Sequence, residues 1–348
     1  MLALSVLALV GLQDPAPPLP KLSTKDLERG ATVGVDAQGT PLESVIAGLE
    51  SECEFGWQAP IGPGPDGQTW WHELPVELSV RRASAWELAD QLAASLGLHC
   101  AGIQFQSIQL AEAAEVFHHG PFAAPAQNAG AFRLQPVWRD EDARELRLLL
   151  FAEPRVMPPA IQSFDVRLSW EGGEQRYTSA EPAGAELAAD GDSPYLVLPL
   201  GEAGIEAEAL TLAVDLQTEV VTEWRATGLD TLGEMLEQPW EDDGVVVEVR
   251  RLLSPADQPD AFEPGMAVEF AVRGARTPVR RAALAERRNS RLSPKGWSET
   301  LDEGQLLTLD FDPAVLRQEL SEYELVLDLP KRRVEWPLAF AFEELALP

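Results

Sequence analysis

Few residues of this 348-residue chain have the types and spacing that chemistry requires. Glu223 and Glu335 form the most suggestive pair, because each precedes a tryptophan and each follows an Asp-Leu pair after a short interval. Two carboxylates that hydrolyse a glycosidic bond lie within about 5–10 Å of each other. Strand geometry instead turns both glutamates outward, in two separate β domains. We interpret them as markers of a repeat, and the sequence predicts no catalytic residue.

Metal and cofactor sites are not predicted either. His118 and His119 are neighbours on an extended segment and therefore point in opposite directions. The acidic clusters 190–192 and 241–243 lack the spacing of a calcium-binding EF-hand loop. The sequence also contains no phosphate-binding loop, dinucleotide fingerprint or nucleophile elbow. We expect no bound metal and no cofactor.

Cys53 and Cys100, the only cysteines, allow two interpretations. In an exported protein they could form a disulfide, which would stabilise by about 4 kcal/mol through loop closure. They could equally be two separate buried thiols, since cysteine often behaves as a small hydrophobic residue. Residue types alone leave both alternatives open.

Charge and the N-terminus restrict the partners and the location. The formal net charge of −30 disfavours nucleic acid and anionic membranes, which bind through Lys and Arg. Residues 1–12 are uncharged and precede a proline-rich break, as in a secretory signal, although they lack the Lys or Arg of a typical signal n-region. We expect residues 1–20 to be a signal peptide or a disordered terminus. The mature chain would then be exported, to the periplasm or the extracellular space, without a transmembrane span.

Residues 31–113 alternate between strand and helix patterns. Thr40-Pro41-Leu42-Glu43 and Ser84-Ala85-Trp86-Glu87 both resemble helix-starting capping boxes. Apolar residues at helical spacing follow each box, and Gly97 ends the second helix. Extended stretches flank both helices. The predicted order is β-α-β followed by β-α-β-β.

This pattern resembles the small modules of the secretin N-terminal and TonB short N-terminal (STN) type. The resemblance rests on residues 78–98, LSVRRASAWELADQLAASLGL, and covers about 80 of the 348 residues. It implies a βαββα-like fold and a role in protein–protein contact within envelope assemblies. The long insertion at 59–75 departs from the family pattern, and no outer-membrane barrel follows the module.

That insertion is rich in Pro and Gly and ends in Trp70 and Trp71, which indicates a loop. Tryptophan is enriched at binding hot spots, so the pair is a candidate contact surface. Alternatively, at least one of the two folds back over the core of the module. Residues 114–129, rich in small residues, are predicted to be a linker.

From Gly130 onward the pattern is all-β, and its second half repeats the first. Leu210–Leu216 aligns with Tyr323–Leu329, and each is followed by a Glu-Trp pair. Further strands are predicted at 220–226 and 333–342. We therefore expect two tandem immunoglobulin-like β-sandwich domains, at 130–230 and 244–348.

The sequence favours a non-catalytic exported protein that contacts a protein partner in the envelope or the extracellular space. A secreted carbohydrate-binding module is the alternative, with Trp70 and Trp71 as exposed, coplanar aromatic side chains. An enzyme of unfamiliar type is the least favoured interpretation, because no catalytic constellation is present.

Overall fold

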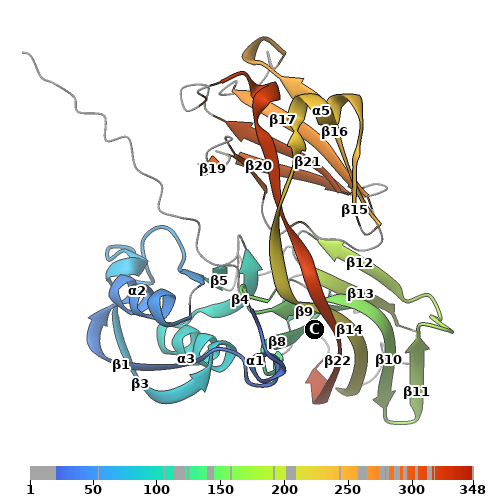
Figure 1. The fold of residues 1–348 in the computed structure, drawn as a ribbon. Helices are drawn as coiled ribbons and strands as arrows, with labels where there is room; N and C mark the ends of the chain where they lie inside the picture. Colours follow the sequence, from blue (N-terminus) through green and yellow to red (C-terminus); the bar gives the residue numbers. More distant parts are fainter. Residues whose placement is uncertain are drawn as a thin grey trace, which may run out of the picture. The chain divides into compact units, whose positions relative to one another are not determined.

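The structure is a computed structural model. It describes residues 21–346 except 54, 105–106, 113–121, 124, 139–144, 157–158, 191–192, 201–208, 243, 258–264, 274–278, 280–281, 286–290, 293–295, 302–304, 312–315 and 317. The fold is mostly β with a small N-terminal α/β part (Figure 1). The predicted fold class, an α+β module followed by β structure, is confirmed to this extent. No helix in the described part of the chain is long and apolar enough to cross a membrane.

The N-terminal α/β part contains the expected order of elements. They are α1 (Thr24–Arg29), β1 (Thr32–Pro41), α2 (Leu42–Cys53), β2 (Gly56–Gln58), the 3-10 turn η1 (Trp71–Glu73), β3 (Pro75–Ser84), α3 (Ala85–Leu96), β4 (His99–Gln104) and β5 (Ser107–Ala111). The capping box at α3 is as predicted: Ser84 Oγ accepts the Glu87 N–H, and the Glu87 carboxylate accepts the Ser84 N–H. Helix α2 begins differently, because Pro41 ends β1 and the Leu42 N–H donates to the Leu74 carbonyl.

These elements form two small sheets and two covering helices. β1 pairs antiparallel with β3, and α2 and α3 pack against this pair (Figure 1). β5 lies between β2, which is parallel to it, and β4, which is antiparallel. Trp86 and Leu92 of α3 and Leu42 and Leu49 of α2 are almost completely buried. The helical spacing seen in the sequence therefore corresponds to real core faces.

The chain divides into two compact units. The first unit contains Lys21–Thr222 together with the chain from Arg332 onward, and the second unit is Glu223–Lys331. The first unit thus includes the α/β part. The hydrophobic core of the α/β part extends into the next sheet through Val137, Leu149 and Phe151. Residues 114–121 and 124 of the predicted linker lie outside the described residues.

The β part of the first unit is built from two sheets around one core. One sheet has the order β12-β13-β9-β8-β6, with β7 also paired to β8, and the other begins β11-β10-β14-β22. Leu148 and Leu150 from the first of these sheets and Leu168 and Leu212 from the second belong to the same buried cluster. The bounds are β6 (Phe122–Ala123), β7 (Gln127–Ala129), β8 (Phe132–Trp138), β9 (Glu145–Ala152), β10 (Ala160–Trp170), β11 (Gly173–Thr178), β12 (Glu186–Asp190), β13 (Ser193–Pro199), β14 (Ala209–Thr231) and β22 (Glu324–Ala346).

The second unit has its own core, in which Phe270, Leu309 and Leu327 are fully buried. Its five-stranded sheet has the order β15-β16-β17-β21-β20, while β18 pairs with Glu324–Leu327 of β22 and with β19. The remaining bounds are α5 (Leu232–Glu237), β15 (Trp240–Asp242), β16 (Val245–Leu253), η2 (Pro255–Asp257), β17 (Met266–Arg273), β18 (Ala282–Ala285), β19 (Arg291–Leu292), β20 (Gly296–Leu301), β21 (Gln305–Phe311) and η4 (Leu320–Glu322).

Two long strands connect the units. β14 and β22 each have 23 residues, they are neighbours in one sheet, and each passes from one unit into the other. They are the yellow and red ribbons that run side by side in Figure 1. Each occupies the place of two predicted strands. The unit bounds also differ from the expected domains 130–230 and 244–348, because residues 223–230 belong to the second unit and the chain from Arg332 belongs to the first.

Candidate contact surface

The loop between β2 and η1, residues 59–70, is folded around one aspartate. We call it the Trp70 loop. Asp66 Oδ1 accepts hydrogen bonds from the backbone N–H groups of Gln68 (2.9 Å) and Thr69 (2.8 Å), and Oδ2 accepts one from the Thr69 hydroxyl (2.7 Å). These bonds, led by the Gln68 amide, hold the pKa of Asp66 below its ordinary value. The side chain is therefore ionised at neutral pH and closes the turn.

Backbone contacts fix the rest of the loop. Pro63 and Trp70 form an antiparallel bridge, the Gly64 N–H donates to the Thr69 carbonyl (2.6 Å), and the Trp71 N–H donates to the Gly62 carbonyl (3.1 Å). Gly62 has a φ of 127°, a conformation that side chains rarely adopt. The Trp70 loop thus has a defined conformation, although none of its residues belongs to a helix or a named strand.

Trp70 and Trp71 have opposite environments. Trp71 is 3% exposed, belongs to the core of the α/β part, and donates its indole N–H to the Glu112 carboxylate at 2.9 Å. Trp70 is 48% exposed, and Ile61 on the same loop is 98% exposed. Of the predicted pair, one tryptophan folds over the core and the other remains available for contact.

Two polar side chains lie near Trp70 along the chain, His72 and Glu73. The ring centroid of Trp70 lies 5.9 Å from that of His72, with the planes tilted by 49°. His72 Nε2 lies 3.8 Å from the Glu73 carboxylate. An exposed aliphatic side chain, an indole and a nearby polar rim can contribute apolar contact area and hydrogen bonds. The described residues contain no cluster of His, Cys, Asp and Glu that could hold a metal ion.

The other predicted site residues lie apart from this surface. Cys53 and Cys100 are both buried and free, so no disulfide links them. Each packs in the apolar core of the α/β part as a small hydrophobic residue. Burial raises the pKa of the Cys53 thiol to about 12 and also raises that of Cys100. Both thiols are therefore poor nucleophiles.

The two Glu-Trp pairs are found in different units but in the reverse of the expected order, because the sequence placed Glu223 in the first β domain and Glu335 in the second. Glu223 lies in the second unit and pairs with Lys331 at 2.7 Å, whereas Glu335 lies in the first unit and is exposed. Trp224 is buried, and Trp336 packs partly buried against the core of the first unit. Of the candidate metal clusters, Asp242 forms an ion pair with Arg225 at 2.9 Å. His118 and His119 lie outside the described residues.

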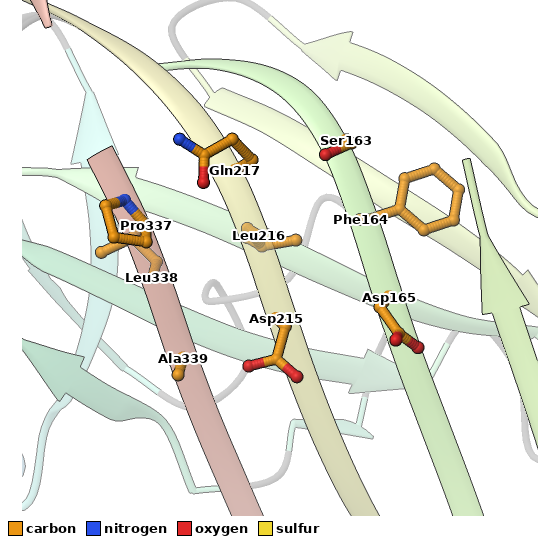
Figure 2. Close-up of a pocket in the computed structure, with 9 residues that line it drawn as sticks. All are labelled: Ser163, Phe164, Asp165, Asp215, Leu216, Gln217, Pro337, Leu338 and Ala339. Atoms are coloured by element: carbon orange, nitrogen blue, oxygen red, sulfur yellow. The ribbon is translucent and has the colours of Figure 1, made fainter. Parts of the chain in front are cut away.

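Sequence reasoning missed a shallow hollow of about 450 Å³ over β10, β14 and β22 (Figure 2). Asp165 and Asp215 lie directly opposite each other on β10 and β14 and border this hollow. Arg176 donates two hydrogen bonds to Asp165, at 2.9 and 2.6 Å, which lowers the pKa of that carboxyl group. Arg167 approaches Asp215 to 3.7 Å. Asp165 is thus held ionised and is unsuited to donate a proton.

A buried carboxylate that the sequence did not reveal joins the α/β part to the first β sheet. Glu153 is completely buried, its two oxygens accept the Ala31 N–H at 2.8 and 2.9 Å, and Arg155 Nε donates to it at 2.8 Å. Burial raises the pKa of Glu153. Its position at the end of an apolar strand carries no distinctive signal, because the partner Ala31 is 122 positions away.

A second joint lies beside it and also fixes the α/β part. Trp86 donates its indole N–H to the Ala131 carbonyl at 3.1 Å, and the Arg133 guanidinium lies 5.6 Å from the centroid of the Trp86 ring. Arg133 also donates to Asp90 of α3 at 2.8 Å. Together with Glu153, these contacts attach the α/β part to the first β sheet within the first unit.

In comparisons with known proteins, no protein-family model matches this chain and no curated protein is detectably similar to it. The candidate surface is therefore interpreted from its geometry and chemistry alone.

Proposed function

We propose that this protein is a non-catalytic binding protein that contacts a protein partner through the Trp70 loop. One observation carries the proposal: Ile61 and Trp70 are exposed on a loop whose conformation is fixed by its own hydrogen bonds. Single exposed apolar side chains that are scattered over mobile loops say little about function. Two on one ordered loop are more informative, because binding then requires little loss of conformational freedom.

The shape of the loop favours a protein partner with an apolar pocket. A side chain as exposed as Ile61 projects from the surface, and the partner must therefore be concave at the contact. Trp70 would provide the anchor, since tryptophan is among the residues that contribute most binding energy at interfaces. A glycan would instead stack on coplanar aromatic rings, and here Trp71 is buried and the His72 ring is tilted relative to Trp70.

The rest of the chain fits the same proposal. The α/β part would be an interaction module similar to the STN type, and the β parts would be immunoglobulin-like sandwiches related by duplication. They would act as spacers and additional contact surfaces in the cell envelope or the extracellular space. The acidic surface would disfavour nucleic acid and anionic lipid and would favour a partner with a basic rim around its pocket.

The test uses the full-length chain, immobilised, and an envelope extract of the source cells. Trp70→Ala removes the anchor, and Leu187→Ala removes an equally exposed apolar side chain, 50% exposed, far along the chain. We expect at least one protein to be retained by the wild type and by Leu187→Ala and lost with Trp70→Ala. If Trp70→Ala retains every protein that the wild type retains, the Trp70 loop is not the contact surface.

Carbohydrate binding is the alternative function, and the same variants test it. A soluble glycan panel titrated against the wild type would quench or shift the Trp70 fluorescence if sugar stacks on that ring. Saturable binding that Trp70→Ala abolishes would favour the glycan interpretation over the protein partner.

A further inference from the structure

The core of the first unit is completed by a strand that comes from the far end of the chain. Leu338, Phe340, Phe342 and Leu345 are each at most 4% exposed and belong to the same buried cluster as Phe132. Alternate residues between them, including Ala339 and Ala341, are exposed. The second half of β22, residues 332–346, therefore fills a groove in the first unit with one complete apolar face.

Contacts to the backbone of this segment hold it in the groove. Thr218 Oγ1 donates to the Trp336 carbonyl at 2.7 Å, and Thr222 Oγ1 donates to the Arg332 carbonyl at 3.4 Å. On β7, the Gln127 side-chain amide accepts the Ala341 N–H at 3.0 Å and donates to the Ala341 carbonyl. Arg333 also forms an ion pair with Glu219 of β14 at 3.1 Å. The groove therefore recognises an extended strand by its main chain and by alternate apolar side chains.

We propose that a second copy of this chain can donate its residues 332–346 to this groove, giving a strand-exchanged dimer. The contacts described above all lie within the first unit, and Pro330 and Lys331 of the second unit directly precede the segment. An identical segment from another copy would restore the same contacts. Exchange of an identical element between protomers is a low-cost route to a dimer, because it creates the dimer from contacts that already stabilise the monomer.

The charge of the chain sets a condition for the exchange. Two copies that each carry −30 repel one another, and salt screens this repulsion. The exchanged dimer should therefore form during refolding at high protein concentration, and its fraction should increase from about 20 mM to about 150 mM salt, where the screening length falls to about 8 Å.

The first experiment refolds the wild-type chain from denaturant at about 1 µM and at about 100 µM and measures the molar mass by light scattering after size exclusion. We expect monomer at the lower concentration and an added species of twice the chain mass at the higher one. A chain that remains monomeric at every concentration and salt overturns the proposal.

The second experiment separates strand donation from other association. The Phe340→Asp chain has a defective donor strand and an intact groove, and it is refolded with a fluorescent synthetic peptide of the sequence 332–348. We expect saturable one-to-one binding and recovery of the near-ultraviolet signal of the first unit. The matched control peptide carries Phe340→Asp and should bind more than tenfold more weakly. Equal binding of the two peptides overturns the proposal, and so does a Phe340→Asp chain whose first unit folds normally without peptide.

Discussion

Replacing Phe340 by alanine measures how much the second half of β22 stabilises the first unit. Phe340 is 4% exposed in the core that the two β sheets of this unit share. Truncating a buried phenylalanine to alanine lowers the free energy of unfolding by about 3–5 kcal/mol. In a unit of this size each kcal/mol corresponds to about 2–4 °C in Tm. We therefore expect the first unit to melt about 10 °C lower, with the second unit unchanged.

Hydrogen exchange followed by mass spectrometry locates the effect. In Phe340→Ala, amides of β8 and β9 should lose protection while those of β16 and β17 retain it. Leu327→Ala is the matched variant, because Leu327 lies on the same strand and is fully buried in the core of the second unit. It should produce the opposite pattern. If Phe340→Ala instead loosens β16 and β17, the C-terminal residues stabilise the second unit and our assignment is wrong.

Three further predictions concern buried groups. Glu153→Gln should lower the free energy of unfolding by about 1–3 kcal/mol, because its amide has one accepting oxygen in place of two and cannot keep all of the hydrogen bonds from Ala31 and Arg155. Burial raises the pKa of Glu153, so the native state binds more protons than the unfolded state above the ordinary glutamate range. Urea titrations should thus show the wild type gaining stability over Glu153→Gln as the pH falls from 7 toward 5, and parallel pH profiles would contradict this. Gly130→Ala would place a Cβ 2.1 Å from the Leu27 carbonyl oxygen, whereas one at Gly172 meets open space. Both glycines have positive φ, so the two substitutions share the same backbone strain. Thermal melts should therefore show Gly130→Ala less stable than Gly172→Ala by about 1–3 kcal/mol. Equal losses of stability in the two variants would contradict the close packing of Gly130 against Leu27. Cys53 and Cys100 should not react with a thiol reagent in the native chain, and both should react in denaturant without reductant; fewer than two thiols there would indicate a disulfide.

Local structure in the α/β part was predictable because its signals are local. The Ser84–Glu87 capping box and Gly97 define both ends of α3 within the segment itself. The same pattern occurs at Thr231 and Glu234, which form the capping box of α5, a helix that the sequence did not predict. A six-residue helix between strands has too few turns to show a helical apolar period.

The long strands could not be predicted, for two physical reasons. Polar residues such as Gln217 and Glu219, or Pro330 and Lys331, resemble a turn between two short strands, although here the chain continues extended through them. An alternating pattern also indicates which residues are buried, but not which sheet the strand joins or which core its side chains enter. Leu338 and Leu327 have similar surroundings in the sequence and belong to different cores.

The contact surface was predictable only as a pair of tryptophans. The sequence indicated a loop and an aromatic pair, but not which ring faces the core. That choice depends on Glu112, whose carboxylate accepts the Trp71 indole N–H although it is 41 positions away. The joints at Glu153 and Arg133 were invisible for the same reason, because each connects segments that are distant in the chain.

The course of β14 and β22 has a consequence for the gene. In most tandem proteins a recombination break between two domains yields fragments that can each be inherited and reused alone. A break near codon 240 of this chain would separate the first unit from its closing strand, and the second unit from residues 223–231 of β14. A rearrangement that keeps both units folded within one chain would have to preserve both crossing strands.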